Sequence, residues 1–380
     1  MILRILHIDT GLSWRGGQKQ LQLLLSELPR ETVESHLVLP QSCEYRDKFA
    51  GLTKNLFCKN FGPLQQLFTA YQLARYCQSN AIDILHVHTA RAHTIAVFIK
   101  LLLARKIPLI VHRQVIFPPS RNIFHPYKYG PQVVSQFIAI SEAVRRALLS
   151  SGVAPQLVTT IKASYQGRGN MLNPEDKRPL KQQLCQEVGF DPQRIVIGFL
   201  GALSAEKGCF DLLKAVDFLR RDLGENPQVL IAGDGPLRRA LEAEITRRKL
   251  QDSVKLLGFR DEVEDFLGAL DILVFPSTSE GLGLGLLEAA FALCAVVATR
   301  VGGINEVIIH EKTGLLVNPS SPREIVKELR QLMANPLLRL KLAVNLRAHV
   351  KKNFSPRQLG TECNRLYQRI FTETKGICKL

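Results

Sequence analysis

The sequence predicts an α/β protein built from two doubly wound, Rossmann-like domains that face each other across a cleft. Short runs of Val, Ile and Leu without polar alternation recur along the chain, as expected of parallel strands that are buried on both faces. Helix-like stretches separate most of these runs, which favours β–α–β units and parallel sheets. The runs form two series, one in each half of the 380 residues, and each half is long enough to bury a core of its own.

The expected strands are short and strongly aliphatic. In open parallel sheets, ligands bind beyond the carboxyl ends of the strands, so functional residues are expected directly after them. The first series comprises residues 2–8, 36–39, 84–88, 109–112 and 137–140. The second series comprises residues 195–200, 229–232, 254–257, 272–275 and 295–298.

The stretch between the two series has the composition of a connector. It contains Gly167, Gly169 and Asn173-Pro174, followed by a run of charges, with one short helix expected at 180–188. We therefore expect a first domain at residues 1–165, a linker at 166–193 and a second domain at 194–353. The opening apolar run ends on an acid and lacks a signal-peptide layout, so the protein is expected in the cytoplasm.

The charge of the chain is positive and unevenly distributed. The formal net charge is +16, and residues 1–190 carry 23 Lys and Arg against 11 Asp and Glu. A basic first half suits contact with something anionic, such as membrane headgroups, a phosphorylated acceptor or nucleic acid, although a solvated basic surface explains it equally well. The eight cysteines include no CxxC pair, which indicates reduced thiols and argues against a disulfide framework or a zinc site.

The strongest local motif is Glu-Gly-Leu-Gly-Leu-Gly-Leu-Leu-Glu at residues 280–288, which follows an expected strand and leads into a helix. Its glycines let a ligand approach the backbone closely, and the amides at the helix start suit an anion. Glu280 and Glu288 are spaced to serve different parts of one extended ligand, a sugar ring and ribose hydroxyls. The alternative is a glycine-rich turn flanked by surface acids.

Two further motifs also follow expected strands. In Gly201 to Gly208, Lys207 can neutralise a diphosphate as negative charge builds on a leaving group, or it is simply a solvated loop lysine. In the first half, Gly16-Gly17 let the backbone approach a phosphate, although the segment is not the GxGxxG dinucleotide fingerprint.

Histidines and a basic loop mark the rest of the first half. His86 and His88 share one face of an expected strand, but no third ligand at a recognisable spacing completes a zinc set, so a role beside the acceptor, or packing, is expected instead. Arg113 opens a loop, residues 113–130, whose basic and aromatic content suits a membrane interface, a sugar acceptor or single-stranded nucleic acid, or plain packing. The chain contains no Asp-x-Asp, the obvious carboxylate pair for holding a nucleotide-bound divalent ion.

Together, residues 195–317 resemble the family 4 glycosyltransferases, also called glycosyl transferases group 1, which have the two-domain GT-B fold. The first half is similar more loosely, through Gly16-Gly17, His86-x-His88 and residues 140–144. The matching elements of the second half are Gly201, Lys207-Gly208, residues 232–236, Gly258-Phe259, residues 269–277, Glu280 to Ala289, Gly302 to Glu306 and residues 313–315.

The resemblance implies a retaining transfer from a nucleotide-sugar donor, without a cofactor or a required metal. It makes Lys207 the phosphate-binding lysine, places Glu280 near the donor sugar and Glu288 on the ribose, and implies that residues 354–380 form a terminal helix that crosses back to the first domain. The expected catalytic residues are Glu280 and Lys207. The expected donor-binding residues are Gly16, Gly17, Gly201, Lys207, Glu280, Gly281, Leu282, Gly283, Leu284 and Glu288, with His86, His88 and Arg113 on the acceptor side.

The sequence also departs from the family pattern. Ala202 stands where the family has an arginine, which leaves one cation fewer on the diphosphate, and His112-Arg113-Gln114 is the nearest match to a histidine that many members carry. Given the basic first half, the expected acceptor is a cell-surface glycan or glycolipid such as lipopolysaccharide, with peripheral contact to an anionic membrane and no nucleic acid. The alternatives are a GT-B epimerase or phosphorylase, and a non-catalytic glycan- or nucleic-acid-binding relative.

Overall fold

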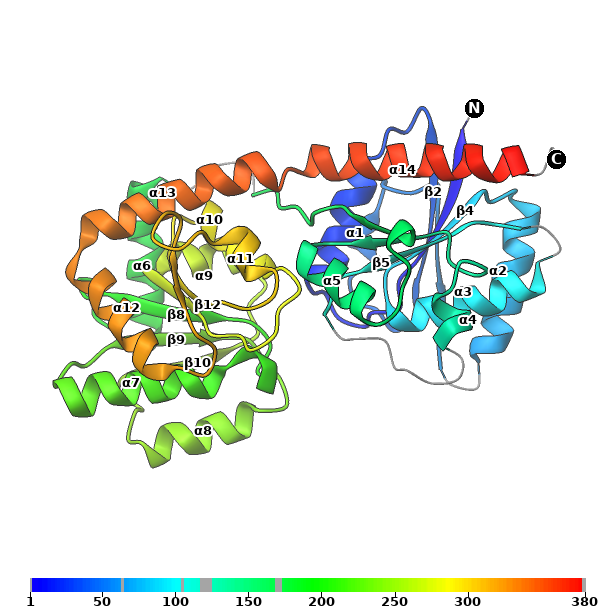
Figure 1. Cartoon of the computed structure of the whole chain (residues 1–380). Helices are drawn as coiled ribbons and strands as arrows, with labels where there is room; N and C mark the ends of the chain where they lie inside the picture. The colour runs from blue at the N-terminus through cyan, green and yellow to red at the C-terminus, as the bar shows by residue number, and fades with distance from the viewer. Residues whose placement is uncertain (1, 63–64, 104–105, 117–124, 168–172, 378–380) are drawn as a thin grey trace. The chain divides into compact units, whose positions relative to one another are not determined.

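The computed structural model describes residues 2–62, 65–103, 106–116, 125–167 and 173–377. They form two compact units (Figure 1). The first unit comprises residues 1–164 and 354–380, and the second comprises residues 165–353. Each unit contains one parallel sheet with helices, which confirms the predicted α/β class and the two doubly wound sheets.

The first unit contains a parallel sheet of seven strands in the order β3-β2-β1-β4-β5-β6-β7. The strands are β1 (Leu3–Ile8), β2 (Val33–Pro40), β3 (Asn55–Lys59), β4 (Ile84–Val87), β5 (Leu109–Arg113), β6 (Gln136–Ala139) and β7 (Val158–Thr160). The helices are α1 (Gly16–Glu27), α2 (Gln66–Ser79), α3 (Ala90–Leu102), α4 (His125–Tyr129), α5 (Glu142–Ser150) and α14 (Pro356–Ile377), with 3-10 turns at Arg46–Phe49 and Pro155–Leu157.

The second unit contains a parallel sheet of six strands in the order β10-β9-β8-β11-β12-β13. The strands are β8 (Val196–Leu200), β9 (Gln228–Ala232), β10 (Val254–Gly258), β11 (Ile272–Phe275), β12 (Ala295–Thr299) and β13 (Leu315–Val317). The helices are α6 (Pro174–Val188), α7 (Cys209–Leu223), α8 (Arg238–Arg247), α9 (Val263–Ala269), α10 (Leu284–Phe291), α11 (Ile304–Val307), α12 (Pro322–Ala334) and α13 (Pro336–Asn353), with a 3-10 turn at Ala205–Lys207.

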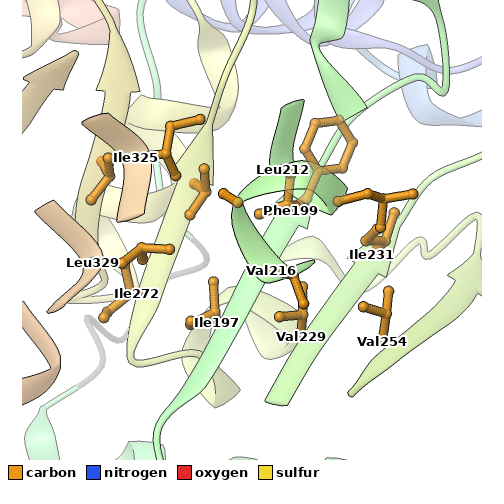
Figure 2. Close-up of a cluster of buried hydrophobic side chains, with 14 of the residues drawn as sticks. Ile197, Phe199, Leu212, Val216, Val229, Ile231, Val254, Ile272, Ile325 and Leu329 are labelled. Atoms are coloured by element: carbon orange, nitrogen blue, oxygen red, sulfur yellow. The ribbon is translucent and has the colours of Figure 1, made fainter. Parts of the chain in front are cut away.

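One core of the second unit lies between its sheet and helices α7 and α12 (Figure 2). Alternate residues of a strand point to the same face, so Ile197 and Phe199 of β8 both enter this core. The helices supply Leu212 and Val216 from α7 and Ile325 from α12, residues spaced to share one helix face with their neighbours. This packing fixes the strands whose carboxyl ends are described below.

The core of the first unit uses both ends of the chain. Helix α14 buries Leu359, Cys363, Leu366, Tyr367 and Ile370 against β1, β4, β5 and α1, and these positions repeat with the spacing of one helix face. The terminal helix is therefore part of the hydrophobic core of the first unit.

Three strands have no counterpart in the sequence prediction: β3, β7 and β13. Each lies at or next to an edge of its sheet, and β7 and β13 are only three residues long. Strand β3 is half-buried and contains Asn55 and Lys59, so it lacks the aliphatic run that marks a central strand. Within the described residues, no helix combines the length and the apolar character needed to cross a membrane.

Candidate active site

Ligand sites in doubly wound sheets lie where the strand order reverses. In the second unit this point falls between β8 and β11, which are neighbours in the sheet although two other strands separate them in sequence order. The loop after β8 contains Gly201 and Lys207, and the loop after β11 contains Glu280. Both motifs predicted from the sequence therefore emerge at this switch point.

The two motifs meet through a direct ion pair. Lys207 Nζ lies 2.5 Å from Glu280 Oε2, and both side chains are mostly buried, with 22% and 14% of their surface exposed. Ser277 Oγ lies 3.5 Å from the same carboxylate oxygen, and the ammonium lies 5.7 Å from the centre of the Phe275 ring. A cation and a carboxylate are thus held together at the edge of the sheet, within reach of solvent.

The backbones of the two loops are locked against each other. Thr278 N–H donates to the carbonyl of Glu206 at 2.8 Å. Gly208 adopts a left-handed conformation with φ +70°, and a Cβ there would lie 1.9 Å from the carbonyl oxygen of Pro276. Only glycine can lie this close to the Pro276 carbonyl. The contact that sets the position of Lys207 therefore requires a glycine at position 208.

The glycine-rich segment 281–283 leads into α10. Gly283 precedes the helix with φ +88°, and Gly281 and Leu282 before it are buried. Gly303 packs against this segment: its N–H donates to the carbonyl of Glu280 at 3.1 Å, and a Cβ there would lie 2.1 Å from the carbonyl oxygen of Gly281. The start of α10 is therefore fixed by backbone contacts, with Leu284 as its first residue.

Glu288 lies on the second turn of α10 and is buried, with 6% of its surface exposed. The carboxyl end of the same helix is held by two cations. Lys177 Nζ donates to the carbonyls of Leu270 and Ala292 at 2.8 and 2.9 Å, and Arg347 donates to the carbonyls at 290 and 291. Cations at helix carboxyl ends are favourable, so these contacts brace the helix that carries the motif.

The loop after β8 is shaped by a second glycine contact. A Cβ at Gly233 would lie 1.8 Å from the carbonyl oxygen of Gly201, and Leu203 N–H donates to the carbonyl of Asp234 at 3.0 Å. Ala202 lies between these contacts and is half-buried. The loop that the family pattern supplies with an arginine thus has a small, neutral side chain here.

The switch point of the first unit falls between β1 and β4. Helix α1 begins at Gly16 directly after the β1 loop, and Asp9 anchors this loop by accepting from Gly11 N–H at 2.7 Å and from Gln18 Nε2 at 3.1 Å. A Cβ at Gly17 would lie 3.0 Å from Gln114 Oε1. Gly16 and Gly17 therefore lie at a helix start on the predicted edge of the sheet.

The three residues expected on the acceptor side are all buried. His86 has no exposed surface, and His88 and Arg113 have 5% and 7%. His86 Nδ1 is hydrogen-bonded to the hydroxyl of Tyr367 on α14 at 2.8 Å. Their assignment to the acceptor stays a prediction. Residues 117–124 of the aromatic-basic loop, including Phe117, Arg121 and Phe124, lie outside the described residues.

Sequence patterns did not point to His7, which joins the other histidines because parallel pairing of β1 and β4 places His7 opposite His86. His112 stacks on His86 with 5.5 Å between ring centres. Burial lowers the pKa of His7 to about 3 and that of His112 to about 4, so both rings are neutral at neutral pH. The signal was present in the sequence, since a histidine stands one residue before the end of each of β1, β4 and β5.

A cavity of about 390 Å³ lies elsewhere in the second unit. It is lined by α6 and by Asp271 and Ala295 at the amino ends of β11 and β12, opposite the edge with Lys207 and Glu280. The switch-point geometry and the packed glycine loops identify the candidate site better than this cavity does.

Fold and site together define a class: two Rossmann-like units with motifs at the switch point of each sheet are the GT-B architecture. Residues 14–162 match the sequence model of Glycosyltransferase Family 4, and residues 181–353 match that of Glycosyl transferases group 1. These adjoining matches take in most of both units. The chain belongs to this family of GT-B glycosyltransferases.

Individual relatives agree with this assignment. The chain is 31% identical to alpha-D-kanosaminyltransferase of Streptomyces kanamyceticus over 197 residues, which is 51% of this chain and only 50% of that protein. It is 23% identical to N-acetyl-alpha-D-glucosaminyl L-malate synthase of Bacillus anthracis over 86% of this chain and 85% of that one. A crystal structure of Anabaena Alr3699/HepE in complex with UDP-glucose superposes with a TM-score of 0.83 at 21% identity, covering 97% of this chain and all of that one.

Proposed function

We propose that this glycosyltransferase transfers a sugar from a nucleotide-sugar to a hydroxyl of a cell-surface glycan or glycolipid, with retention at the anomeric carbon and without a metal ion. The observation that carries the proposal is the ion pair of Lys207 and Glu280 at the switch point of the second sheet. The pair supplies a cation for a diphosphate and a carboxylate for a sugar, and the glycine loops around it leave backbone amides at the start of α10.

Lys207 is the residue we assign to the departing diphosphate. In the ligand-free chain its ammonium is neutralised by Glu280 at 2.5 Å. A diphosphate carries more negative charge than one carboxylate and therefore competes for the ammonium. Donor binding then turns Lys207 toward phosphate, where it stabilises the charge that develops as the glycosidic bond breaks.

Glu280 is the residue we assign to the donor sugar. Ser277 and Lys207 hold its carboxylate at the loop end. When Lys207 turns to phosphate, a carboxylate oxygen becomes an acceptor for sugar hydroxyls and a negative charge beside an oxocarbenium-like transition state. Glu288, buried on the second turn of α10, is assigned to the ribose hydroxyls.

The proposed chemical step is a front-face substitution. The bond from the anomeric carbon to the leaving phosphate oxygen breaks, and a bond to the acceptor oxygen forms on the same face of the ring. The acceptor proton passes to the departing diphosphate, which leaves as the nucleoside diphosphate. A lysine and helix-start amides supply the positive field in this scheme, so no divalent ion is needed.

The donor is proposed to be a UDP-sugar in the first instance, because the structurally similar Anabaena protein was crystallised with UDP-glucose. For the acceptor we propose a glycan or glycolipid at an anionic membrane. The first unit exposes Leu67, Phe68 and Tyr71 on α2 and Leu101 and Leu102 on α3, two helices that pack against each other. Exposed apolar side chains on a basic unit suit shallow contact with anionic headgroups.

Donor screening with matched variants tests the assignment. In the wild type, a UDP-sugar is expected to raise the melting temperature, since a ligand that binds only the folded state stabilises it. Lys207→Ala and Glu280→Gln are each expected to lower kcat/KM by about 10²–10³-fold, and Lys214→Ala, an exposed lysine paired with Asp211, serves as the control. Full transfer activity in both site variants would refute the roles, and products formed without an acceptor would favour an epimerase or phosphorylase.

Two further measurements test the finer proposals. Activity that disappears on chelation and returns with a divalent ion would refute metal-independent transfer. Flotation with vesicles containing anionic lipid is expected for the wild type, and it should weaken in a Leu67→Ser, Phe68→Ser double variant. Equal flotation of wild type and variant would refute the membrane contact. That result would leave the proposed donor site unaffected.

A further inference from the structure

The apolar core of the first unit changes character near the carboxyl ends of its strands. Along one face of the sheet, Ile5 is followed by His7 in β1, and Ile110 by His112 in β5. Ile84 is followed by His86 in β4 and by His88 directly after that strand. Register pairs His7 with His86, and continuing the β4–β5 register pairs His88 with His112. Four imidazoles therefore form one continuous buried patch, with exposed surface of 5% or less each.

This patch contains an unusual concentration of buried nitrogen atoms that lack hydrogen bonds. Within the described part of the chain, His7 Nε2, His86 Nε2 and His88 Nδ1 have no partner, and neither nitrogen of His112 has one. Each such atom costs free energy in an apolar core unless something binds it. Of these atoms, His86 Nε2 is free to bind a guest, whereas His7 and His88 offer the two nitrogens that contact each other.

We propose that His7, His86 and His88 bind one first-row transition-metal ion, zinc by ligand preference, inside the first unit. Ligand nitrogens of these three residues all lie within 4.8 Å of one another. Imidazole nitrogens suit zinc, copper, nickel and iron rather than magnesium or calcium. The site shares no residue with the donor-binding set of Lys207, Glu280 and Glu288, and metal binding would replace the acceptor-side role expected of His86 and His88.

Two of the ligands already have the spacing of a coordinated pair. His7 Nδ1 and His88 Nε2 lie 3.2 Å apart. Two ligands of a tetrahedral zinc ion, each about 2.0–2.1 Å from the metal, are about 3.3–3.4 Å apart. In the unliganded chain one of these nitrogens donates a proton to the other. A shift of that proton to the other nitrogen of the same ring frees both lone pairs, and the rings stay neutral.

The third ligand is oriented by a contact outside the coordination sphere. His86 Nδ1 is hydrogen-bonded to Tyr367 Oη at 2.8 Å, which leaves His86 Nε2 for the metal. A ligating histidine typically donates its second ring nitrogen to such a partner, and this fixes both tautomer and ring orientation. Because the ligand atoms lie within 4.8 Å of one another, the His86 ring needs to approach the other two by at most about 1.5 Å to reach tetrahedral spacing.

A carboxyl group also lies near the patch. Asp9 lies two residues after His7, directly past the end of β1, and therefore about 7 Å further along the chain. It is buried, and its Oδ2 has no hydrogen-bond partner among the described residues.

The experiment uses the full chain, freed of any histidine tag, refolded with zinc and then dialysed. Because the ligands have almost no exposed surface, the ion is expected to enter during folding and to exchange slowly. Elemental analysis should give about one zinc per wild-type chain, and refolding with Co²⁺ should give the intense visible absorption of tetrahedral cobalt. A wild-type chain that retains no stoichiometric ion and shows only weak octahedral cobalt absorption overturns the proposal.

Variants separate this site from adventitious binding. His7→Gln and His88→Gln should each lose the ion, whereas His93→Gln, an equally buried histidine outside the patch, should keep it. Tyr367→Phe removes only one hydroxyl and is expected to weaken zinc binding by about 10–100-fold. This variant keeps the test valid if a histidine variant fails to fold. Equal zinc content in the wild type, His88→Gln and Tyr367→Phe would overturn the proposal. Sugar transfer that requires a metal ion would instead refute the proposed function. A failure of the zinc-site proposal can therefore be told apart from a failure of the proposed function.

Discussion

The ammonium of Lys207 and the carboxylate of Glu280 are 2.5 Å apart although the two residues lie 73 positions apart in the sequence. The contact exists because β8 and β11 are adjacent in the sheet, so the loops that follow them emerge side by side. It depends equally on Gly208, whose missing side chain admits the carbonyl of Pro276.

Replacing Gly208 by alanine should therefore damage the candidate site. The Cβ would overlap the Pro276 oxygen, and the left-handed φ of +70° adds a backbone penalty of about 1 kcal/mol. We expect loss of donor binding by calorimetry and a lower melting temperature. The matched control is Gly189→Ala, which has φ +74° but meets no described atom within 4 Å, so it should incur only the backbone penalty. Similar losses of donor binding in the two variants would contradict the contact argument.

Lys177→Met should destabilise the second unit. Methionine retains most of the aliphatic volume but leaves the carbonyls of Leu270 and Ala292 without their shared donor. Relief of the buried charge, whose pKa is lowered chiefly by burial, offsets part of this loss. The net expectation is about 2 kcal/mol less stability in urea unfolding. Lys214→Met, at a half-exposed lysine, should change stability little, and equal midpoints for the two variants would argue against a bracing role.

Acid should destabilise the first unit through His93. This ring is buried against Tyr129 at 5.1 Å between ring centres, and burial lowers its pKa to about 3. The unfolded chain binds the proton near pH 6.5 and the folded chain only near pH 3. Above pH 6.5 the ring is neutral in both states, and the fold has its full stability. As the pH falls from 6.5 toward 3, the free energy of unfolding decreases by about 1.4 kcal/mol per pH unit. His93→Phe should show a shallower loss between pH 6.5 and 5 in thermal melts, whereas an unchanged slope would contradict the assignment.

Gly360→Ala should weaken the attachment of α14. Alanine is the better helix former by about 1 kcal/mol, so propensity alone predicts stabilisation. A Cβ at this position would lie 2.5 Å from the Cβ of Glu27 on α1, and we expect this clash to prevail and to lower the melting temperature. Gly376→Ala on the same helix meets none of the described atoms within 4 Å and should be neutral or stabilising. A higher melting temperature for Gly360→Ala would refute close packing.

The central strands and the glycine-rich loop at Glu280 were predictable because their causes are local. An aliphatic run buried on both faces marks β8 or β11 without any knowledge of its neighbours. A glycine-rich turn with an acid marks the loop at Glu280 in the same way. The short strands β7 and β13 were not predictable, since pairing with an already formed sheet, rather than their own three residues, defines them.

The contacts between side chains within each site depend on how the strands pair. They could not be predicted from the spacing of residues in the sequence. His86 and His88 were visible as a pair in the sequence, but His7 joins them only through the pairing of β1 with β4. The hydrogen bond from His86 to Tyr367 spans 281 positions and depends on how α14 packs against the first sheet. Such contacts are set by tertiary packing, which no local pattern encodes.

The placement of α14 in the core of the first unit has a consequence for the order of folding during synthesis. The first unit begins with β1, yet Leu359, Cys363 and Tyr367 of its core are made after the whole second unit. The second unit is continuous in sequence, and all of its residues have left the ribosome before those of α14 emerge. The half of the protein that is translated first therefore completes its fold last, with its sheet incompletely covered until the final helix arrives.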